Sequence, residues 1–266
     1  MKKLSVIDLF SGIGGFSLGL ESTGHFETVE FWETDPFCQE VLRKHWKDVP
    51  IYEDVRYFGL NRQPTQADVV CGGFPCQPFS VAGKRKGADD ERYLWEAMFR
   101  VVQEAKPSWV VCENVKGLIN YGLERMVSDL EREGYSVQTF LIGAEGLGLP
   151  HKRERVFVVA YSEDNRRNRR CLSAGDDKKK SCKRKTITSS GFVFREDGAE
   201  ALSRVCRNYY GIPSKLDKGK RLKALGNAVV PQIIMRIGEA ILEAEGIRHI
   251  PSPLWAYPQT SVGVLP

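Results

Sequence analysis

Apolar segments alternate with segments of helical spacing along the first 161 residues of this chain. The apolar segments are a few residues long and are bounded by turn residues, which is typical of buried strands. Alternating strands and helices with short connections form a mostly parallel sheet with helices on both faces, so the sequence predicts an α/β fold. The predicted strands span residues 4–10, 28–32, 67–71, 108–113, 137–142 and 155–161, and the predicted helices span 16–20, 37–46, 91–105 and 123–133.

Ligands of such sheets bind beyond the carboxyl ends of the strands. Glycine, acidic and polar residues gather at these predicted ends, which makes this edge of the sheet the candidate site. The residues concerned are 10–15, Glu33, Asp54, 74–76 and 113–114.

The regular pattern stops after Tyr161, and positive charge accumulates there. Residues 162–220 contain 16 Lys and Arg against 8 Asp and Glu, a net charge of +8, whereas the remainder carries −3 of the total of +5. A basic segment on a near-neutral body is typical of a surface that binds a polyanion, and a solvated loop is the alternative. Order resumes with a predicted helix at 232–244, which begins after Pro231 and should pack back onto the sheet.

The loop after the third predicted strand places Cys76 between Pro75 and Pro78. Each proline fixes φ and lacks an N–H donor, so this stretch cannot continue a sheet or enter a helix interior. A thiol on such a stiff loop is placed as a nucleophile would be. An inert cysteine in a proline-rich turn is the alternative, because free cysteines are often simply buried.

Gly12 and Gly14 follow the first predicted strand, and Glu33 ends the second. The glycines allow a ligand to approach the backbone closely, and an acidic residue at this position can accept hydrogen bonds from ribose hydroxyls. Ser17 stands where the full dinucleotide fingerprint requires glycine, which disfavours NAD. Another cofactor that contains adenosine fits better.

Several classes of protein are disfavoured by what the chain does not contain. No apolar run approaches the roughly 20 residues needed to span a bilayer, and the N-terminus becomes charged too soon for a signal peptide, so we expect a cytoplasmic protein with no membrane partner. The seven cysteines are scattered without CxxC pairs or histidine partners, so we expect neither a disulfide framework nor a metal site.

Five stretches, in order, resemble the DNA (cytosine-5)-methyltransferases. They are Asp-Leu-Phe-Ser-Gly-Ile-Gly-Gly-Phe at 8–16, Gly-Phe-Pro-Cys-Gln-Pro-Phe-Ser at 73–80, Glu-Asn-Val at 113–115, His-Lys-Arg-Glu-Arg-Val at 151–156 and Gly-Asn-Ala-Val-Val at 226–230. The resemblance covers residues 4–161 and 221 to about 245. An inert Cys76 would leave the other four stretches unexplained, so the resemblance favours the nucleophile.

The resemblance implies a Rossmann-like fold that binds S-adenosylmethionine. Residues 1–161 and 221–250 would form the catalytic domain, and residues 162–220 a small irregular target-recognition region. Residues 251–266 would be an extended C-terminal tail.

The resemblance also implies the reaction, transfer of a methyl group to C5 of cytosine in DNA. Cys76 would add to C6 of a cytosine flipped out of the duplex, and Glu113 would act as the proton donor to N3 of that cytosine. Arg153 and Arg155 would complete the catalytic residues, with Arg155 at the cytosine O2.

Ten residues would bind S-adenosylmethionine by the same resemblance. Glu33 would contact the ribose, and Asp54 would lie near the adenine amino group. Thr34 stands where family members can carry a tryptophan beside the adenine. The ten expected residues are Phe10, Gly12, Ile13, Gly14, Glu33, Asp54, Pro75, Leu94, Asn227 and Ala228.

Residues 80–90 would correspond to a loop that closes on DNA, with cations suited to phosphates. The expected DNA contacts are Ser80, Lys84, Arg85 and Lys86. The expected partner is double-stranded DNA, with or without a cognate restriction endonuclease as a second partner. We expect a monomer. An RNA-methylating relative that acts on transfer RNA stays open, as does a catalytically silent nucleic-acid-binding protein.

Overall fold

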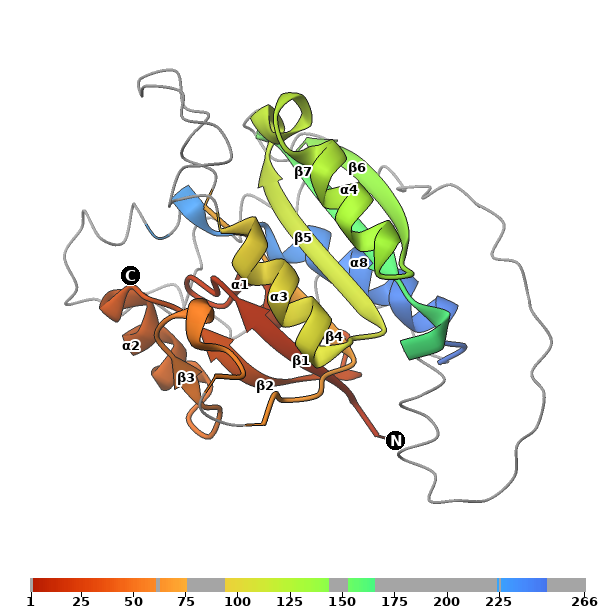
Figure 1. Cartoon of the computed structure of the whole chain (residues 1–266). Helices are drawn as coiled ribbons and strands as arrows, with labels where there is room; N and C mark the ends of the chain where they lie inside the picture. Colours follow the sequence, from red (N-terminus) through yellow and green to blue (C-terminus); the bar gives the residue numbers. More distant parts are fainter. Residues whose placement is uncertain are drawn as a thin grey trace, which may run out of the picture.

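The computed structural model describes residues 2–60, 63–75, 94–143, 153–165, 224 and 226–247. Within these residues one seven-stranded sheet has the order β3-β2-β1-β4-β5-β7-β6 (Figure 1). The strands are β1 (Leu4–Leu9), β2 (Phe26–Trp32), β3 (Ile51–Tyr52), β4 (Val69–Gly72), β5 (Trp109–Val115), β6 (Ser136–Gly143) and β7 (Glu154–Tyr161).

The sheet is mostly parallel, as the sequence predicts. β1 pairs in parallel with β2 and β4, β2 with β3, and β4 with β5. β7 is antiparallel to both of its neighbours, β5 and β6. After β5 the chain forms β6 at the edge of the sheet, and β7 then fills the position between β5 and β6. The carboxyl ends of β1, β2, β4 and β5 therefore share one edge with the amino end of β7.

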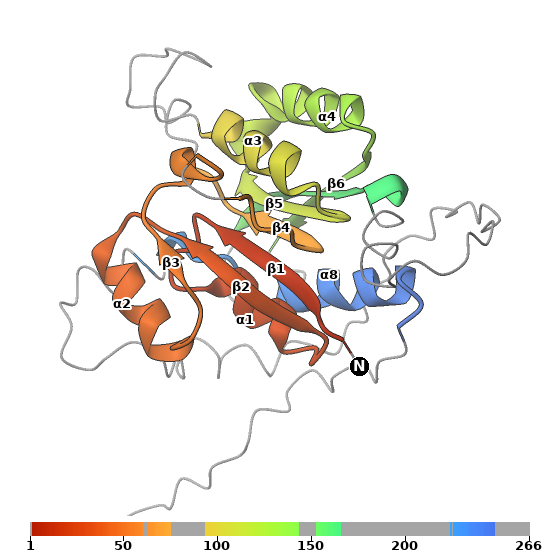
Figure 2. The ribbon, with the colours of Figure 1, turned by 60° about the horizontal axis from the view of Figure 1, so that its bottom comes forward.

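Helices cover both faces of the sheet, which confirms the α/β prediction. α3 (Trp95–Ala105) and α4 (Leu123–Arg132) lie above the sheet in Figure 2, whereas α1 (Gly15–Glu21) and α8 (Pro231–Ala244) lie below it. α2 (Pro36–His45) follows β2 and is capped by Asp35, whose side chain accepts the Phe37 N–H.

Alternation along the strands divides the core into two apolar layers. In β1, Ile7 belongs to the layer that contains Trp95 of α3. The preceding residue, Val6, belongs to the layer that contains Phe16 of α1 and Ile233 of α8. The helix predicted at 232–244 thus packs back onto the sheet, as expected.

Three short elements were not predicted from the sequence. β3 has two residues, and η1 (Val55–Tyr57) and η4 (Lys116–Asn120) are 3₁₀ helices of three and five residues. Segments of two to five residues do not show a recognisable period, so hydrophobic patterning cannot reveal them.

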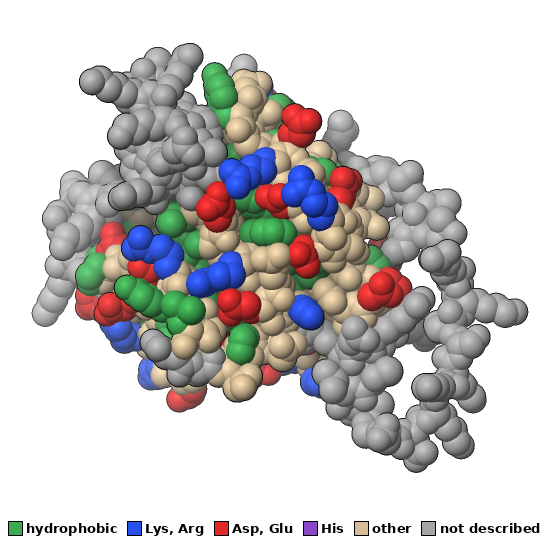
Figure 3. All heavy atoms as spheres, viewed as in Figure 1, with side chains coloured by type: hydrophobic (Ala, Val, Ile, Leu, Met, Phe, Trp, Pro, Cys, Tyr) green, Lys and Arg blue, Asp and Glu red, His purple; other side chains and the backbone are tan. Residues whose placement is uncertain are grey.

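Lysine and arginine side chains alternate with aspartate and glutamate over the face shown in Figure 3. This mixed surface agrees with the near-neutral charge of the body of the chain. None of the helices described by the structure has the length and apolar character to cross a membrane.

Candidate functional site

The loop after β1 has an unusual backbone. Phe10, Gly12 and Gly14 have φ angles of 51°, 53° and 84°, in the left-handed region. This region suits glycine, and it is strained for Phe10. A Cβ on Gly14 would lie 2.7 Å from the ring of Trp46, whereas one on Gly12 would meet nothing within 4 Å. The loop is therefore closely packed at Gly14 and open at Gly12.

Glu33 joins the loop after β1 to the loop after β2. Its Oε2 accepts the N–H of Gly12 and its Oε1 that of Asp35, both at 2.7 Å. Burial raises the pKa of Glu33, and the N–H groups of Asp35 and Gly12 oppose this shift. The Thr34 N–H also lowers this pKa, and a carboxylate has about four lone-pair sites, so the three N–H groups leave room for a further donor.

Two of the expected cofactor residues, Phe10 and Leu94, pack against the same apolar cluster. That cluster includes Trp32, whose ring stacks on Tyr52 with centroids 4.7 Å apart. The indole N–H of Trp32 donates to Glu30 Oε2 at 3.1 Å. Trp32 is not among the residues predicted from the sequence, although its position directly before Glu33, the acidic residue at the strand end, was an available signal.

Asp54 caps η1 and pairs with a residue that the sequence analysis also missed. Its carboxylate accepts the backbone N–H of Arg56 at 2.9 Å and the Nη2 of the same residue at 2.7 Å. Hydrogen bonds from the Arg56 side chain lower the pKa of Asp54. The Asp-x-Arg spacing was the available signal for this pair.

Asn114 connects the end of β5 to the loop after β4. Its Nδ2 donates to the carbonyl of Phe74 at 3.0 Å, and its Oδ1 accepts the N–H of Val115. In the same loop, a Cβ on Gly73 would lie 3.1 Å from Glu113 Oε2. The Gly-Phe-Pro loop and the Glu-Asn-Val strand end are thus in direct contact, and the chain continues from Pro75 to Cys76.

Glu113 and Arg155 form an ion pair at this edge of the sheet. Arg155 Nε lies 2.9 Å from Glu113 Oε1, and their side chains are 23% and 11% exposed. The pairing of Val115 with Arg155 across β5 and β7 brings the two residues together. Burial raises the pKa of Glu113, and the positive charges of Arg155 and Arg153 oppose it.

Arg153 contacts the returning C-terminal segment. Its Nη1 donates to the carbonyl of Gly226 at 2.5 Å and its Nη2 to that of Ala228 at 3.0 Å. Burial lowers the pKa of Arg153, the charge of Arg155 adds to this shift, and Glu113 opposes it. This contact brings Asn227 and Ala228 to the strand ends.

Several predicted residues lie outside the described part of the chain. These are Cys76 and the four expected DNA contacts, Ser80, Lys84, Arg85 and Lys86. The predicted recognition region, 162–220, is described only at 162–165, and the predicted tail, 251–266, is not described.

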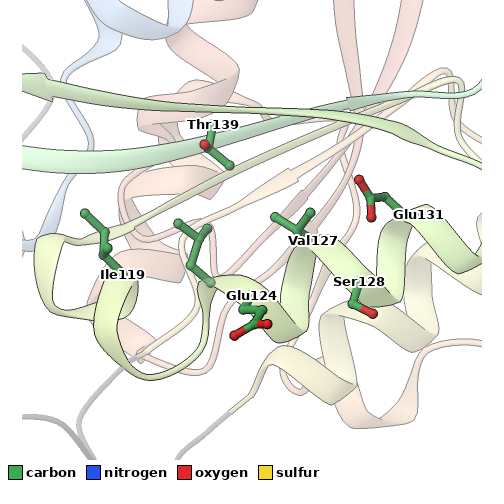
Figure 4. A pocket seen from close by; sticks show the side chains of 7 residues that line it. Ile119, Glu124, Val127, Ser128, Glu131 and Thr139 are labelled. Atoms are coloured by element: carbon green, nitrogen blue, oxygen red, sulfur yellow. The ribbon is translucent and has the colours of Figure 1, made fainter.

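A pocket of about 450 Å³ lies between α4, η4 and β6 (Figure 4). Glu124, Val127, Ser128 and Glu131 line it from α4, and Thr139 lies opposite them on β6. None of the predicted site residues that the structure describes lines this pocket, and its two carboxylates do not suit a polyanion. In the described ranges, no group of three or more His, Cys, Asp or Glu residues is arranged to hold a metal ion.

Comparison with known proteins identifies the family. A family model described as C-5 cytosine-specific DNA methylase matches residues 4–205. The chain belongs to this family. The match includes β1 to β7 and therefore the strand ends described above.

Curated relatives of this chain are type II methyltransferases. M.AquIA of Picosynechococcus sp. is 38% identical over 179 residues, which are 59% of this chain and 71% of that protein. M.HhaI of Haemophilus parahaemolyticus is 37% identical over 166 residues, 60% of this chain and 50% of that protein. M.HgiCII of Herpetosiphon aurantiacus is 37% identical over 168 residues, 61% and 38% of the two chains. The matched part of this chain thus spans half or less of the length of M.HhaI and M.HgiCII.

Solved structures support the same fold. A prophage-encoded protein of E. coli, described as a DNA modification methyltransferase, is 28% identical with a TM-score of 0.51, covering 62% of this chain and 48% of that one. The Entamoeba histolytica methyltransferase EhMeth has a TM-score of 0.64 at 15% identity, covering 92% and 99%. This chain therefore has the Rossmann-like fold of S-adenosylmethionine-dependent methyltransferases.

Proposed function

We propose that this methylase transfers a methyl group from S-adenosylmethionine to C5 of cytosine in double-stranded DNA. The Glu113–Arg155 ion pair carries the proposal. A largely buried carboxyl group beside a guanidinium can contact two neighbouring positions of a cytosine ring, N3 and O2. The pair lies beside the loop that leads to Cys76, and membership in the C-5 cytosine-specific family supports the same chemistry.

The strand ends around Glu33 fit a cofactor that contains adenosine. The Glu33 carboxylate leaves room for a ribose hydroxyl as a further donor, Phe10 and Leu94 share an apolar cluster suited to adenine, and the space beside Gly12 is open. When bound, S-adenosylmethionine supplies an electrophilic methyl group. We assign its binding to Phe10, Gly12, Ile13, Gly14, Glu33, Asp54, Pro75, Leu94, Asn227 and Ala228.

The first chemical step makes C5 of cytosine a nucleophile. The Cys76 thiolate adds to C6, and the electrons of the C5–C6 double bond move through the ring as N3 takes a proton from Glu113. The product is a covalent adduct whose C5 carries enamine electron density. Because burial raises the pKa of Glu113, this residue keeps a proton at higher pH than an exposed glutamate does.

The last step releases the product. Once C5 has taken the methyl group, with S-adenosylhomocysteine as the other product, the remaining proton on C5 passes to water and the C5–C6 double bond forms again. Cys76 leaves as a thiolate, and the N3 proton returns to Glu113. Arg155 holds the ring in place throughout by a hydrogen bond to the base oxygen O2.

DNA binding rests on parts of the sequence beyond the strand ends. The target base must leave the stack, at a cost of a few kcal/mol that contacts to phosphates and groove edges offset. We assign these contacts to Ser80, Lys84, Arg85 and Lys86 and to the basic region 162–220, separate from the catalytic domain of 1–161 and 221–250. A monomer in the cytoplasm, with or without a cognate restriction endonuclease, fits this role.

The two alternative functions, methylation of RNA and nucleic-acid binding without catalysis, receive less support. The family model that matches is that of a DNA methylase, and the curated relatives are type II methyltransferases. The likeness to EhMeth, at 15% identity, concerns the fold alone.

Expression in a methylation-free bacterial host tests the proposal. Sequencing of the host DNA should show 5-methylcytosine in a defined context with the native chain and none with Cys76→Ser. Labelled methyl transfer to transfer RNA, with unmethylated DNA, would refute the DNA assignment. An active Cys76→Ser variant would refute the mechanism.

A further inference from the structure

Arg153 holds the backbone of the C-terminal segment at two points. It precedes β7 by one residue, and its two terminal nitrogens donate to the carbonyls of Gly226 and Ala228 at 2.5 and 3.0 Å. These carbonyls flank Asn227. Hydrogen bonds from a charged donor are about twice as strong as neutral ones, so this contact constrains the segment more than a neutral side chain would.

The same segment also rests on α1. A Cβ on Gly15 would lie 2.8 Å from Cγ1 of Val229, and one on Gly19 would lie 2.5 Å from the carbonyl oxygen of Pro231. The segment from Gly226 to Pro231 is therefore held between the start of β7 and the helix that follows the glycine loop. Arg153 provides the hydrogen bonds that hold this segment, and α1 provides the packing contacts.

Arg153 and Arg155 direct their donors differently. Arg155 Nε contacts Glu113 at 2.9 Å and its Nη1 donates to the adjacent carbonyl of Glu154 at 2.9 Å, whereas both terminal nitrogens of Arg153 donate to carbonyls of the distant C-terminal segment. Both charges act on Glu113, but only Arg155 forms an ion pair with it. The two arginines of the Arg-Glu-Arg motif thus have separate contacts.

We propose that Arg153 is a positioning residue that sets cofactor affinity by fixing residues 226–228, and that Arg155 alone of the two contacts the target base. The inference rests on the proposed function, because it takes Asn227 and Ala228 as part of the cofactor site. It replaces the catalytic role expected for Arg153 from the sequence. Lysine cannot reproduce the contact, since one ammonium group lacks the planar fork that reaches two carbonyls.

The test separates binding from turnover. S-adenosylhomocysteine is titrated calorimetrically into the full-length chain without DNA, and methyl transfer to DNA is measured at saturating S-adenosylmethionine. Arg153→Gln should weaken binding about tenfold, with turnover at saturation reduced no more than about threefold. Arg155→Gln should show the reverse, with unchanged binding and turnover reduced by about a hundredfold or more.

Glu154→Gln is the matched control. Glu154 lies between the two arginines, and its side chain forms an exposed ion pair with Lys116 at 2.9 Å. The substitution leaves its backbone carbonyl, which accepts a hydrogen bond from Arg155 Nη1, in place, so both measurements should stay at the native values. All titrations are made at a temperature at which thermal unfolding curves show folded protein. If Arg153→Gln fails to fold, Arg153→Lys provides the measurement, with binding weakened about threefold to tenfold.

Native binding by Arg153→Lys or Arg153→Gln, together with lost turnover, would overturn the inference in favour of a catalytic Arg153. A native chain that binds S-adenosylhomocysteine but methylates no DNA would refute the proposed function, while the binding comparison would still decide the role of Arg153. A native chain that does not bind S-adenosylhomocysteine would overturn both.

Discussion

At the residue scale, Gly73 makes room for the carboxylate of Glu113. A Cβ at this position would lie 3.1 Å from Glu113 Oε2, which is closer than most such contacts in proteins. The neighbouring backbone is fixed by the hydrogen bond from Asn114 to the carbonyl of Phe74. The carboxylate would therefore have to move to accommodate even a methyl group.

Gly73→Ala should reduce the rate of methyl transfer by about tenfold to a hundredfold, because small displacements of a catalytic group are costly. The rate is measured with saturating DNA and S-adenosylmethionine. Gly117→Ala is the control, because a Cβ at Gly117 meets nothing within 4 Å. Equal rates for both variants would show that Gly73 is not needed for the position of Glu113.

Asp8 is a fully buried acid in β1. Ser17 donates to its Oδ2 from Oγ at 2.7 Å and from the backbone N–H at 3.2 Å, whereas Oδ1 has no hydrogen-bond partner. Burial raises its pKa from 3.8 to about 8, against the effect of the Ser17 bonds. Because the folded protein holds this proton more tightly than the unfolded chain, stability should fall as pH rises from about 4 to 8.

Asp8→Asn should remove this pH dependence, since the amide does not ionise. Urea unfolding at pH 5 and pH 9 should show similar stability of the two proteins at pH 5 and a more stable variant at pH 9, by about 1 kcal/mol or more. Asp48→Asn, at an exposed position, should behave as the native chain does. A variant that is less stable than the native chain at pH 9 would contradict the prediction.

At the element scale, α1 and α8 pack closely because α1 presents glycine. A Cβ on Gly19 would lie 2.5 Å from the carbonyl oxygen of Pro231 and 2.6 Å from Cβ of Ile234. Both neighbours belong to α8, one in its backbone and one at a buried position, so neither can move without shifting the helix.

Gly19→Ala should therefore destabilise the protein by about 1–3 kcal/mol, although alanine favours a helix by about 1 kcal/mol over glycine. Chemical denaturation measures the change. The Gly117→Ala protein again serves as the control, with little change in stability. A more stable Gly19→Ala protein would mean that helix propensity outweighs the contact with α8.

Periodicity predicted the longer elements well and their ends less well. The strand predicted at 108–113 runs from Trp109 to Val115, and the helix predicted at 123–133 ends at Arg132. The helix predicted at 91–105 is described from Trp95 onward. Apolar spacing reports which residues are buried, but hydrogen bonds and caps set where an element ends.

At the scale of the whole molecule, charge is divided between a near-neutral body and a basic segment. Lys178, Lys179 and Lys180 belong to that segment, outside the described residues. If they neutralise phosphates, replacing all three by glutamine should make DNA affinity less dependent on salt. The slope of log affinity against log salt should fall in magnitude by up to about three.

Fluorescence anisotropy of labelled duplex DNA between about 50 and 200 mM salt measures this slope. Lys2, Lys44 and Lys47 are exposed on the body and serve as a matched set of three glutamine substitutions. Their slope should equal the native one. An equal loss in both variants would indicate that total charge, and not the basic segment, determines DNA affinity.

The sequence by itself determined the strand and helix order, the α/β class and the types of residue at the strand ends. These follow from local periodicity and from short motifs, which need no knowledge of distant contacts. Tertiary structure decided which of these residues meet. β7 entered the sheet between β5 and β6, and this placed Arg155 on Glu113 and Arg153 on Gly226 and Ala228. Such pairs depend on sheet register and on helix packing between distant segments, and the spacing of neighbouring residues predicts neither.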